Sequence, residues 1–203
     1  MNIFMEYVFL DTEIYMIRMN YKEIGQYEYN WYCEYMFPSC RRRVISLVKR
    51  EPVRRIMQWQ VFSRKTDYYY QKSHGDATTL IDKFLYLYYI CLRNRMGEKL
   101  GLEIDTRNIG KGLVVYHYNN VVNVSAIIGE NLHLHGCNVI GNAGNGDLRC
   151  PVIGNNVMMG AGAKVIGNVT IADNIKIAAG AVVVTSFTEP GITIGGIPAR
   201  RLK

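Results

Sequence analysis

An aliphatic residue or methionine recurs at every sixth position through much of the C-terminal half of this 203-residue chain. The clearest run comprises Ile153, Met159, Val165, Ile171, Ile177 and Val183. Helices repeat every 3.6 residues and strands every two, so neither alone produces this spacing. A chain that turns a corner after each short strand does, and the Gly, Asn and small polar residues between the apolar positions suit such corners. The period therefore predicts a parallel β-helix with the apolar residues stacked inside it.

The same period extends upstream, where its register gains one residue. We place the interior residues at Ile109, Val115, Val121 and Ile127 and, after the gain, at Ile128, Leu134 and Ile140. The period stops across residues 142–152, where glycines, a proline and polar residues occur instead. This segment is predicted to be a loop extruded from the β-helix, which is a common place for functional residues in solenoid proteins.

The first 100 residues lack the six-residue period. Within them, Arg42–Met57 and Leu80–Met96 space their apolar residues three or four apart, which predicts helices. Composition changes near residues 97–103, after which Gly, Asn, Val and Ile become more frequent. We therefore expect a mainly β protein with a helical N-terminal region at 1–100 and a β-helix domain at 101–203, which includes the loop 142–152 and a C-terminal tail.

Composition narrows the classes of protein that the chain can belong to. Hydrophobic residues make up 49% and charged residues 20%, as in globular proteins. The five cysteines have neither CxxC nor metal-ligand spacing, which favours a reduced, cytoplasmic setting without a bound metal. The N-terminal stretch lacks the basic region and cleavage site of a signal peptide. The longest apolar run, Phe84–Leu92, is too short to span a bilayer.

Positive charge is concentrated in one part of the helical region. The net charge is +7, and ten Lys or Arg residues lie between Arg41 and Lys72 against only Glu51 and Asp67. We favour a helical cap over the open end of the β-helix. Oligomer contacts and peripheral association with the inner face of the cell membrane are alternatives, because apolar residues such as Trp59 are interspersed. No motif that reads nucleic acid is recognisable, so no nucleic-acid partner is expected.

Three strings carry a resemblance to a known family: Ile109–His117, Ile153–Ile171 and Ile194–Arg200 (IGGIPAR). On these strings the chain resembles the hexapeptide-repeat acyltransferases, which have left-handed parallel β-helices. Within the serine acetyltransferase-like superfamily, it is most similar to the branch that O-acetylates capsular and other surface polysaccharides. The resemblance implies a homotrimer, acetyl-CoA as co-substrate, a saccharide acceptor and a cleft between two subunits.

The resemblance assigns the role of general base to His117. This residue would remove the proton from an acceptor hydroxyl as its oxygen attacks the thioester carbonyl. His135 follows 18 residues later and is expected one coil above His117, where it either contacts the acceptor or packs the structure. We expect the acceptor also to contact Tyr116 and, in the extruded loop, Asn142, Asp147 and Cys150.

Two residues depart from the pattern of serine acetyltransferases. Tyr116 stands where those enzymes carry an acidic residue directly before the histidine. Cys150, in the string GDLRCP, stands where they carry a second histidine. A nucleophilic Cys150 would need a base that the sequence does not supply, so we expect this residue in the pocket wall. Both departures favour the polysaccharide branch.

The resemblance places coenzyme A along the small residues of successive coils. The basic C-terminus suits the phosphates of this cofactor, and an ordinary solvated tail is the alternative. The expected cofactor-binding residues are Gly160, Ala161, Lys164, Ala179, Arg200, Arg201 and Lys203.

Three functions stay open at this point. We favour an acetyl-CoA-dependent O-acetyltransferase that modifies a sugar hydroxyl of a capsular or other surface polysaccharide, or of its precursor. The alternative enzyme is a serine O-acetyltransferase of cysteine biosynthesis. A non-catalytic trimeric β-helix scaffold is the alternative from another class, and the presence of His117 argues against it.

Overall fold

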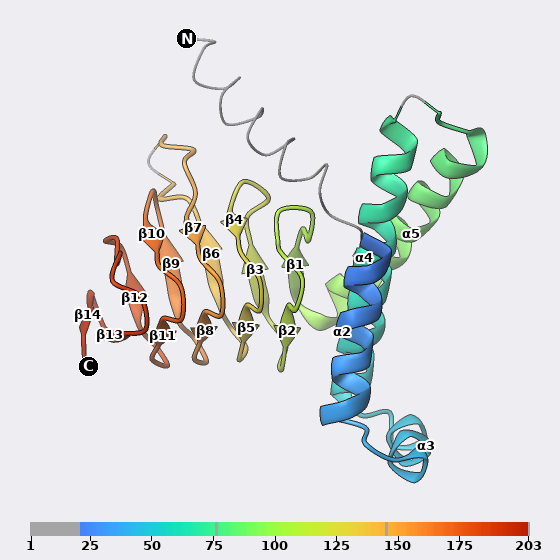
Figure 1. Cartoon of the computed structure of the whole chain (residues 1–203), viewed down its shortest axis with the longest axis horizontal. Helices are drawn as coiled ribbons and strands as arrows, with labels where there is room; N and C mark the ends of the chain where they lie inside the picture. The colour runs from blue at the N-terminus through green and yellow to red at the C-terminus, as the bar shows by residue number, and fades with distance from the viewer. Residues whose placement is uncertain (1–20, 76, 145, 203) are drawn as a thin grey trace.

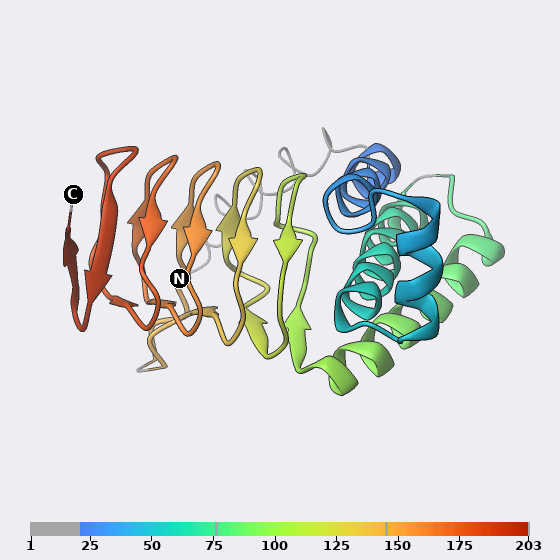
Figure 2. The same cartoon turned by 90° about the horizontal axis from the view of Figure 1, so that it is seen from below.

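The computed structural model describes residues 21–75, 77–144 and 146–202, so the N-terminal stretch and Lys203 lie outside the described residues. Four helices stand at one end of a column of short strands (Figure 1). The helices are α2 (Tyr21–Tyr35), α3 (Cys40–Val48), α4 (Pro52–His74) and α5 (Leu80–Leu100). Figure 2 shows the coils side by side along one axis, from the helices at one end to β14 at the other.

The strands form three sheets that wrap around one core. The first sheet contains β1 (Leu102–Ile104), β3 (Asn120–Val122), β6 (Val139–Gly141), β9 (Lys164–Ile166) and β12 (Val182–Val183). The second contains β4 (Ile127–Ile128), β7 (Val152–Ile153) and β10 (Thr170–Ile171). The third contains β2 (Val114–Val115), β5 (His133–Leu134), β8 (Met158–Met159), β11 (Lys176–Ile177), β13 (Thr193–Gly196) and β14 (Ala199–Arg201). Apart from the antiparallel β13–β14 pair, neighbouring strands are parallel.

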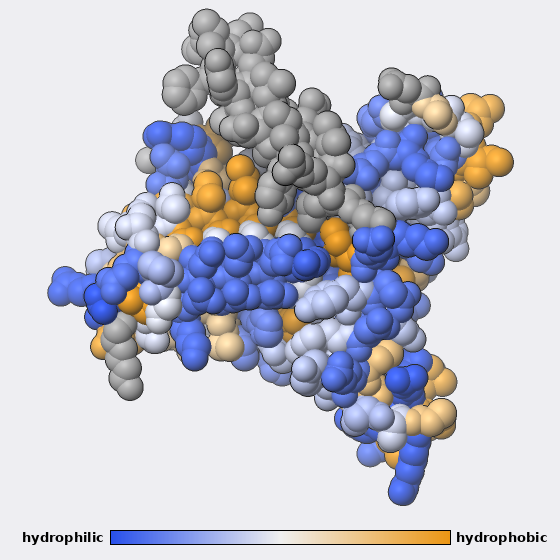
Figure 3. Space-filling view, viewed as in Figure 1, coloured by the Kyte–Doolittle hydropathy of each residue, from blue (hydrophilic) through white to orange (hydrophobic). Residues whose placement is uncertain are grey.

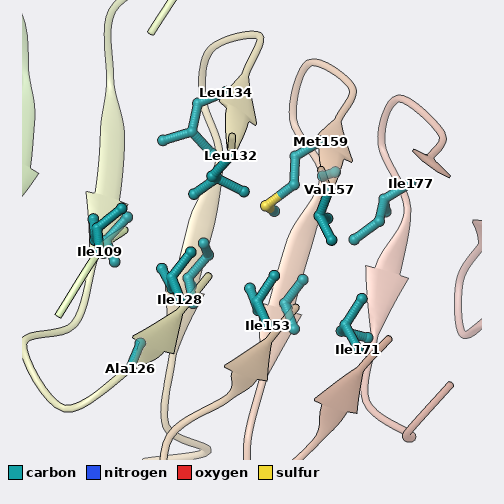
Figure 4. Close-up of a cluster of buried hydrophobic side chains, with 14 of the residues drawn as sticks. Ile109, Ala126, Ile128, Leu132, Leu134, Ile153, Val157, Met159, Ile171 and Ile177 are labelled. Carbon is teal, nitrogen blue, oxygen red and sulfur yellow. The ribbon is translucent and has the colours of Figure 1, made fainter. Parts of the chain in front are cut away.

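The predicted fold, a left-handed parallel β-helix preceded by helices, is confirmed. All six apolar residues of the main run are at most 2% exposed and stack along the interior. Figure 4 shows one such row, in which Ile109, Ile128, Ile153 and Ile171 follow one another from coil to coil. Each short strand contributes only one or two buried side chains to the interior, so no coil could bury its apolar surface without its neighbours.

The register of the upstream coils differs from the prediction. Val121 is 37% exposed whereas Val122 is 4% exposed, and Ile128 rather than Ile127 is fully buried. The extra residue therefore lies between Val115 and Val122, not at Ile127–Ile128. Asn120 explains the shift, because it occupies the inward position that alternates with Val122 in β3.

The segment Arg42–Met57 forms two helices instead of one. α3 ends at Val48, and Arg50 adopts a left-handed conformation with φ 51°. Pro52 is then the first residue of α4, a position that proline favours because its missing N–H is not needed there. Glu51 N–H bonds back to the Ser46 carbonyl across this turn at 3.1 Å.

α4 supplies the contact that closes the open end of the β-helix. The first coil has no coil before it, so its backbone groups face the helices without strand partners. The Arg64 guanidinium donates to the carbonyls of Thr106 at 2.9 Å, Ile109 at 3.0 Å and Gly110 at 2.8 Å. One side chain thereby satisfies three backbone acceptors of the first coil.

α2 completes the same cap along β2. Glu28 pairs with Arg64 at 2.7 Å and also accepts the Leu113 N–H at 3.1 Å. The Tyr32 hydroxyl accepts the Val115 N–H at 3.2 Å and donates to the Val115 carbonyl at 3.1 Å. These side chains make the hydrogen bonds that a preceding strand would otherwise make. The cap interpretation of the helical region is therefore confirmed.

The charged and apolar residues of the cap are buried, which affects their charge pairing, their pKa values and their access to solvent. Glu28 and Arg64 are each about 2% exposed and neutralise each other. Burial raises the pKa of Asp67, which accepts a hydrogen bond from Thr106, to about 7. Trp59 is 1% exposed in the β-helix core cluster, so its expected availability to a membrane surface is wrong.

Replacing Arg64 tests the cap directly. We expect Arg64→Ala to lower the free energy of unfolding by about 3–5 kcal/mol, because it strands the buried Glu28 carboxylate and three carbonyls. Arg55→Ala, at an exposed arginine of the same helix, should change it by no more than about 0.5 kcal/mol. Urea unfolding followed by circular dichroism measures both. Equal, small losses in the two variants would contradict the cap.

Candidate active site

The corner between the third and the first sheet carries His117. Strands β2, β5, β8 and β11 pair in register, which aligns one buried position, occupied by Val115, Leu134, Met159 and Ile177. Two residues beyond that position, successive coils place His117, Gly136, Ala161 and Ala179. We call these four residues the His117 corner. The coils are linked there by backbone bonds of 2.9 Å, from Gly162 N–H to the Gly136 carbonyl and from Gly180 N–H to the Ala161 carbonyl.

Two buried asparagines hold the backbone of the His117 corner. Asn120 Nδ2 donates to the His117 carbonyl at 2.7 Å, and its Oδ1 accepts the Asn138 N–H at 3.0 Å. Asn138 Nδ2 donates to the Gly160 carbonyl at 2.7 Å. The asparagines are fully buried while the His117 side chain is exposed. An exposed imidazole on a fixed backbone is suited to exchange a proton with a bound substrate.

Gly136, not His135, lies level with His117. The pairing of Val115 with Leu134 sets an offset of 19 residues between these coils, one more than the 18 that three six-residue repeats predict. A Cβ on Gly136 would lie 2.7 Å from the His117 Cβ, and Gly136 has φ 111°. Only glycine fits here without displacing His117.

His135 instead lies level with Tyr116, the residue before His117. The two rings stack with centroids 4.6 Å apart, and Nε2 of His135 is buried without a hydrogen-bond partner among the described residues. The Tyr116 hydroxyl is 3.2 Å from Nδ1 of His133. Burial and the neighbouring His135 lower the pKa of His133, so its neutral ring can accept that hydroxyl proton near pH 7.

The expected loop residues lie on a different corner of the same chain. Asn142, Asp147 and Cys150 belong to the connection between β6 and β7, which joins the first sheet to the second. Hydrogen bonds from Arg149 lower the pKa of Asp147 to about 2 and keep its carboxylate charged. Cys150 is 8% exposed, and burial raises the pKa of its thiol, which disfavours a thiolate nucleophile. Within a single chain, these three residues therefore do not lie beside His117.

A groove lies between α5 and the first sheet. Its volume is about 1010 Å³, and its walls include Asn119, two residues after His117, and Asn142. Arg93 and Glu98 of α5 line its far side. Asn142 thus shares a hollow with the neighbourhood of His117, whereas neither Asp147 nor Cys150 lines it.

The expected cofactor residues that the structure describes lie in three places. Gly160, Ala161 and Ala179 lie at or beside the His117 corner, and a Cβ on Gly160 would come within 2.6 Å of the Ala179 nitrogen. Lys164 is exposed on β9, on the outer face of the first sheet. The exposed Arg200 and Arg201 lie on β14, which folds back against β13. Arg201 pairs with Glu189 at 2.6 Å, and the prediction for Lys203 falls outside the described residues.

Sequence reasoning missed the aromatic residues of α2 at this site. The Trp31 ring lies 6.2 Å from the ring of Tyr116 and stacks on Tyr35 at 5.0 Å. Trp31 and Tyr116 are 85 positions apart and carry no shared motif, so no local pattern could have paired them. The requirement for glycine at position 136 could not be predicted either, because it depends on the extra residue lying between Val115 and Val122.

Within residues 21–75, 77–144 and 146–202, no three His, Cys, Asp or Glu side chains gather closely enough to hold a metal ion. None of the helices in this part of the chain combines the length and hydrophobicity that crossing a bilayer requires.

Sequence comparison links the chain to acetyltransferases of two kinds. Serine acetyltransferase 1, chloroplastic, of Arabidopsis thaliana is 38% identical over 132 residues, which are 64% of this chain and 42% of that protein. The putative colanic acid biosynthesis acetyltransferase WcaB of Escherichia coli (strain K12) is 35% identical over 97 residues, which are 47% of this chain and 60% of that protein. The chain spans 42% to 60% of the length of the first curated relatives. No protein-family model matches it.

Structural comparison gives the same fold. The serine acetyltransferase (CysE) of Neisseria gonorrhoeae matches with a TM-score of 0.64 and 29% identity, over 94% of this chain and 69% of that one. The serine acetyltransferase of Brucella abortus strain S19 in complex with coenzyme A matches with a TM-score of 0.62 over 95% of this chain and 72% of that one. At 22% identity, this second likeness shows the fold alone. The chain therefore has the fold of the serine acetyltransferases and is similar in sequence to hexapeptide-repeat acetyltransferases.

The fit between Gly136 and His117 predicts a specific effect of one methyl group. We expect Gly136→Ala to shift the imidazole NMR signals of His117, because the new Cβ cannot share the space of the His117 Cβ. Gly180→Ala is the matched control: its φ of 70° imposes similar backbone strain, but nothing lies within 4 Å of the added Cβ. Unchanged His117 signals in the Gly136→Ala protein would show that the two coils are farther apart than described.

Proposed function

We propose that the protein transfers an acetyl group from acetyl-CoA to a hydroxyl of a saccharide acceptor. The single observation that carries this proposal is the His117 corner, where an exposed histidine begins a row that continues as small residues on the next coils. Small side chains leave room for an extended pantetheine arm along that row. The likeness to acetyltransferases in sequence and fold supports the same reaction.

His117 would act as the general base of this transfer. Its imidazole takes the proton of the acceptor hydroxyl while the hydroxyl oxygen attacks the thioester carbonyl. A carbon–oxygen bond forms and the carbon–sulfur bond breaks. The proton then passes from the imidazolium to the departing sulfur, which leaves as the thiol of coenzyme A. Backbone N–H groups near the corner would stabilise the oxyanion of the intermediate.

The choice of a saccharide over serine rests on residues around His117. Tyr116 puts an uncharged aromatic ring at the position before the histidine, and Cys150 is a buried thiol where a second histidine is expected from the resemblance. Serine O-acetyl transfer is the second candidate, and the 38% identity to a plant serine acetyltransferase favours it.

A homotrimer would complete the site. In a single chain, His117 lies at the corner between the third and first sheets, and the β6–β7 loop lies at the corner between the first and second. Threefold packing of prisms can bring unlike corners of two copies together. We therefore place the loop of one protomer beside the His117 corner of its neighbour.

A membrane-facing role for α3 belongs to the same proposal. Nearly the whole helix is exposed, with Val44, Leu47 and Val48 on one side and Arg41–Arg43 in its first turn. Figure 3 shows hydrophobic and hydrophilic side chains intermixed around this projecting helix. A short basic, amphipathic helix of this kind suits the surface of an anionic membrane, where lipid-linked saccharides are found.

Replacing His117 tests the reaction. We expect His117→Ala to lower acetyl transfer about 100- to 10,000-fold, the range for losing a general base. The assay follows release of free coenzyme A thiol with a panel of saccharides and with L-serine. His74→Ala, the same substitution at a histidine on α4, is the control and should retain full activity. Undiminished transfer in the His117→Ala protein would remove the base assignment, and transfer to L-serine alone would select the second candidate.

The membrane proposal predicts binding to anionic vesicles. Val44→Ser/Leu47→Ser/Val48→Ser should weaken co-sedimentation with phosphatidylglycerol-containing vesicles roughly tenfold or more. The control is Leu80→Ser/Ile81→Ser/Phe84→Ser, which removes three exposed apolar residues from α5. Pure phosphatidylcholine vesicles should bind poorly in every case. Equal sedimentation of the wild-type protein and the α3 variant would rule out this use of α3.

A further inference from the structure

Aromatic rings from two distant parts of the chain meet at Tyr116, the residue directly before His117. Trp31 and Tyr35 come from α2, and Tyr116 and His133 come from β2, its following corner and β5. Trp31 stacks on Tyr35 at 5.0 Å and meets the rings of Tyr116 and His133 edge-on at 6.2 Å. We call the first three, Trp31, Tyr35 and Tyr116, the aromatic platform.

The position of the platform is fixed by the cap. Tyr32 bonds both backbone groups of Val115, and the residues directly beside this pair in sequence are Trp31 and Tyr116. The hydrogen bonds of Tyr32 therefore hold the Trp31 and Tyr116 rings at a set distance. Behind Tyr116, the stacked ring of His135 prevents it from turning inward. Rings held in this way lose little conformational freedom when a ligand binds.

The platform is open to a ligand. Tyr35 is 63% exposed, while Trp31 and Tyr116 are partly exposed. Tyr116 directly precedes the proposed general base, so a molecule stacked on it comes close to His117.

The chemistry of the platform matches a sugar ring. A pyranose has a face of C–H groups, and the negative face of an aromatic ring attracts such weakly positive hydrogens. The nearest polar pair is the Tyr116 hydroxyl and Nδ1 of His133, 3.2 Å apart, and burial together with the neighbouring His135 lowers the pKa of His133, which favours an uncharged pair. A zwitterionic amino acid would instead need charged groups to pair with its ammonium and carboxylate.

We infer that Trp31, Tyr35 and Tyr116 form a stacking subsite that binds a pyranose ring of the acceptor and presents one of its hydroxyls to His117. The inference rests on the proposed acetyl transfer, and it names the residues that select the acceptor class. Stacking contributes to binding and orientation, whereas His117 contributes to the chemical step, so the two can be separated by kinetics.

Kinetics on the most active saccharide of the panel provides the first test. We expect Trp31→Ala to raise the KM for the saccharide about five- to tenfold, the scale of one lost aromatic contact, and to leave the KM for acetyl-CoA unchanged. Trp31→Phe, which keeps an aromatic face, should recover most of the loss. Tyr88→Ala, at an exposed aromatic of α5, is the control and should behave as wild type. An unchanged saccharide KM in Trp31→Ala would overturn the inference while leaving the transfer reaction intact.

Binding without turnover provides a second, independent test. Methyl glycosides of glucose, galactose and mannose should change the tryptophan fluorescence of the His117→Ala protein in a saturable way, and L-serine should not. Trp31→Phe in that background should abolish the change, because the remaining Trp59 is buried. Saturable binding without transfer by the wild-type protein would support the subsite and refute the proposed function. A failure of all three glycosides to change the fluorescence would refute the subsite.

Discussion

The buried Arg64 guanidinium is the contact on which the rest of the structure depends. A β-helix grows by adding coils, and each coil pairs its backbone with the one before it, so the first coil needs a substitute partner. Arg64 provides three donors to that coil, and Glu28 balances its charge while accepting a further N–H. The pair is expensive to bury, and the backbone bonds it makes offset that cost. The helical region is thus part of the β-helix fold rather than an appendage to it.

The same contact connects the cap to the candidate site. Because α2 must lie along β2 to place Glu28 and Tyr32, it also brings Trp31 to Tyr116, next to His117. The buried Asn120 side chain then binds the His117 carbonyl and the Asn138 N–H, so that it fixes the backbone of this coil to that of the next. Cap, aromatic rings and the His117 corner therefore form one connected structure, in which the candidate base is exposed and its support is buried.

Much of the fold could be predicted from the six-residue period, because stacking coils demand one interior residue at each step. The position of the extra residue could not be predicted in this way. Val121 and Val122 are both aliphatic, as are Ile127 and Ile128, so hydrophobicity does not show which member of each pair points inward. The deciding residue is Asn120, whose buried amide is satisfied only by corner backbone and by Asn138. Likewise, Glu28 and Arg64 are 36 positions apart, and their pairing has no local signal. His117, Ala161 and Ala179 were found through resemblance, whereas Gly136 and Trp31 required the structure.

The proposed acetyl transfer requires that the acyl donor binds along the His117 corner. A crystal structure of the protein with coenzyme A tests this claim most directly. The pantetheine arm should run beside Ala179 and Ala161, with its thiol end near His117 and the loop of a neighbouring protomer close by. Coenzyme A bound at a different corner, with its thiol remote from His117, would contradict the account.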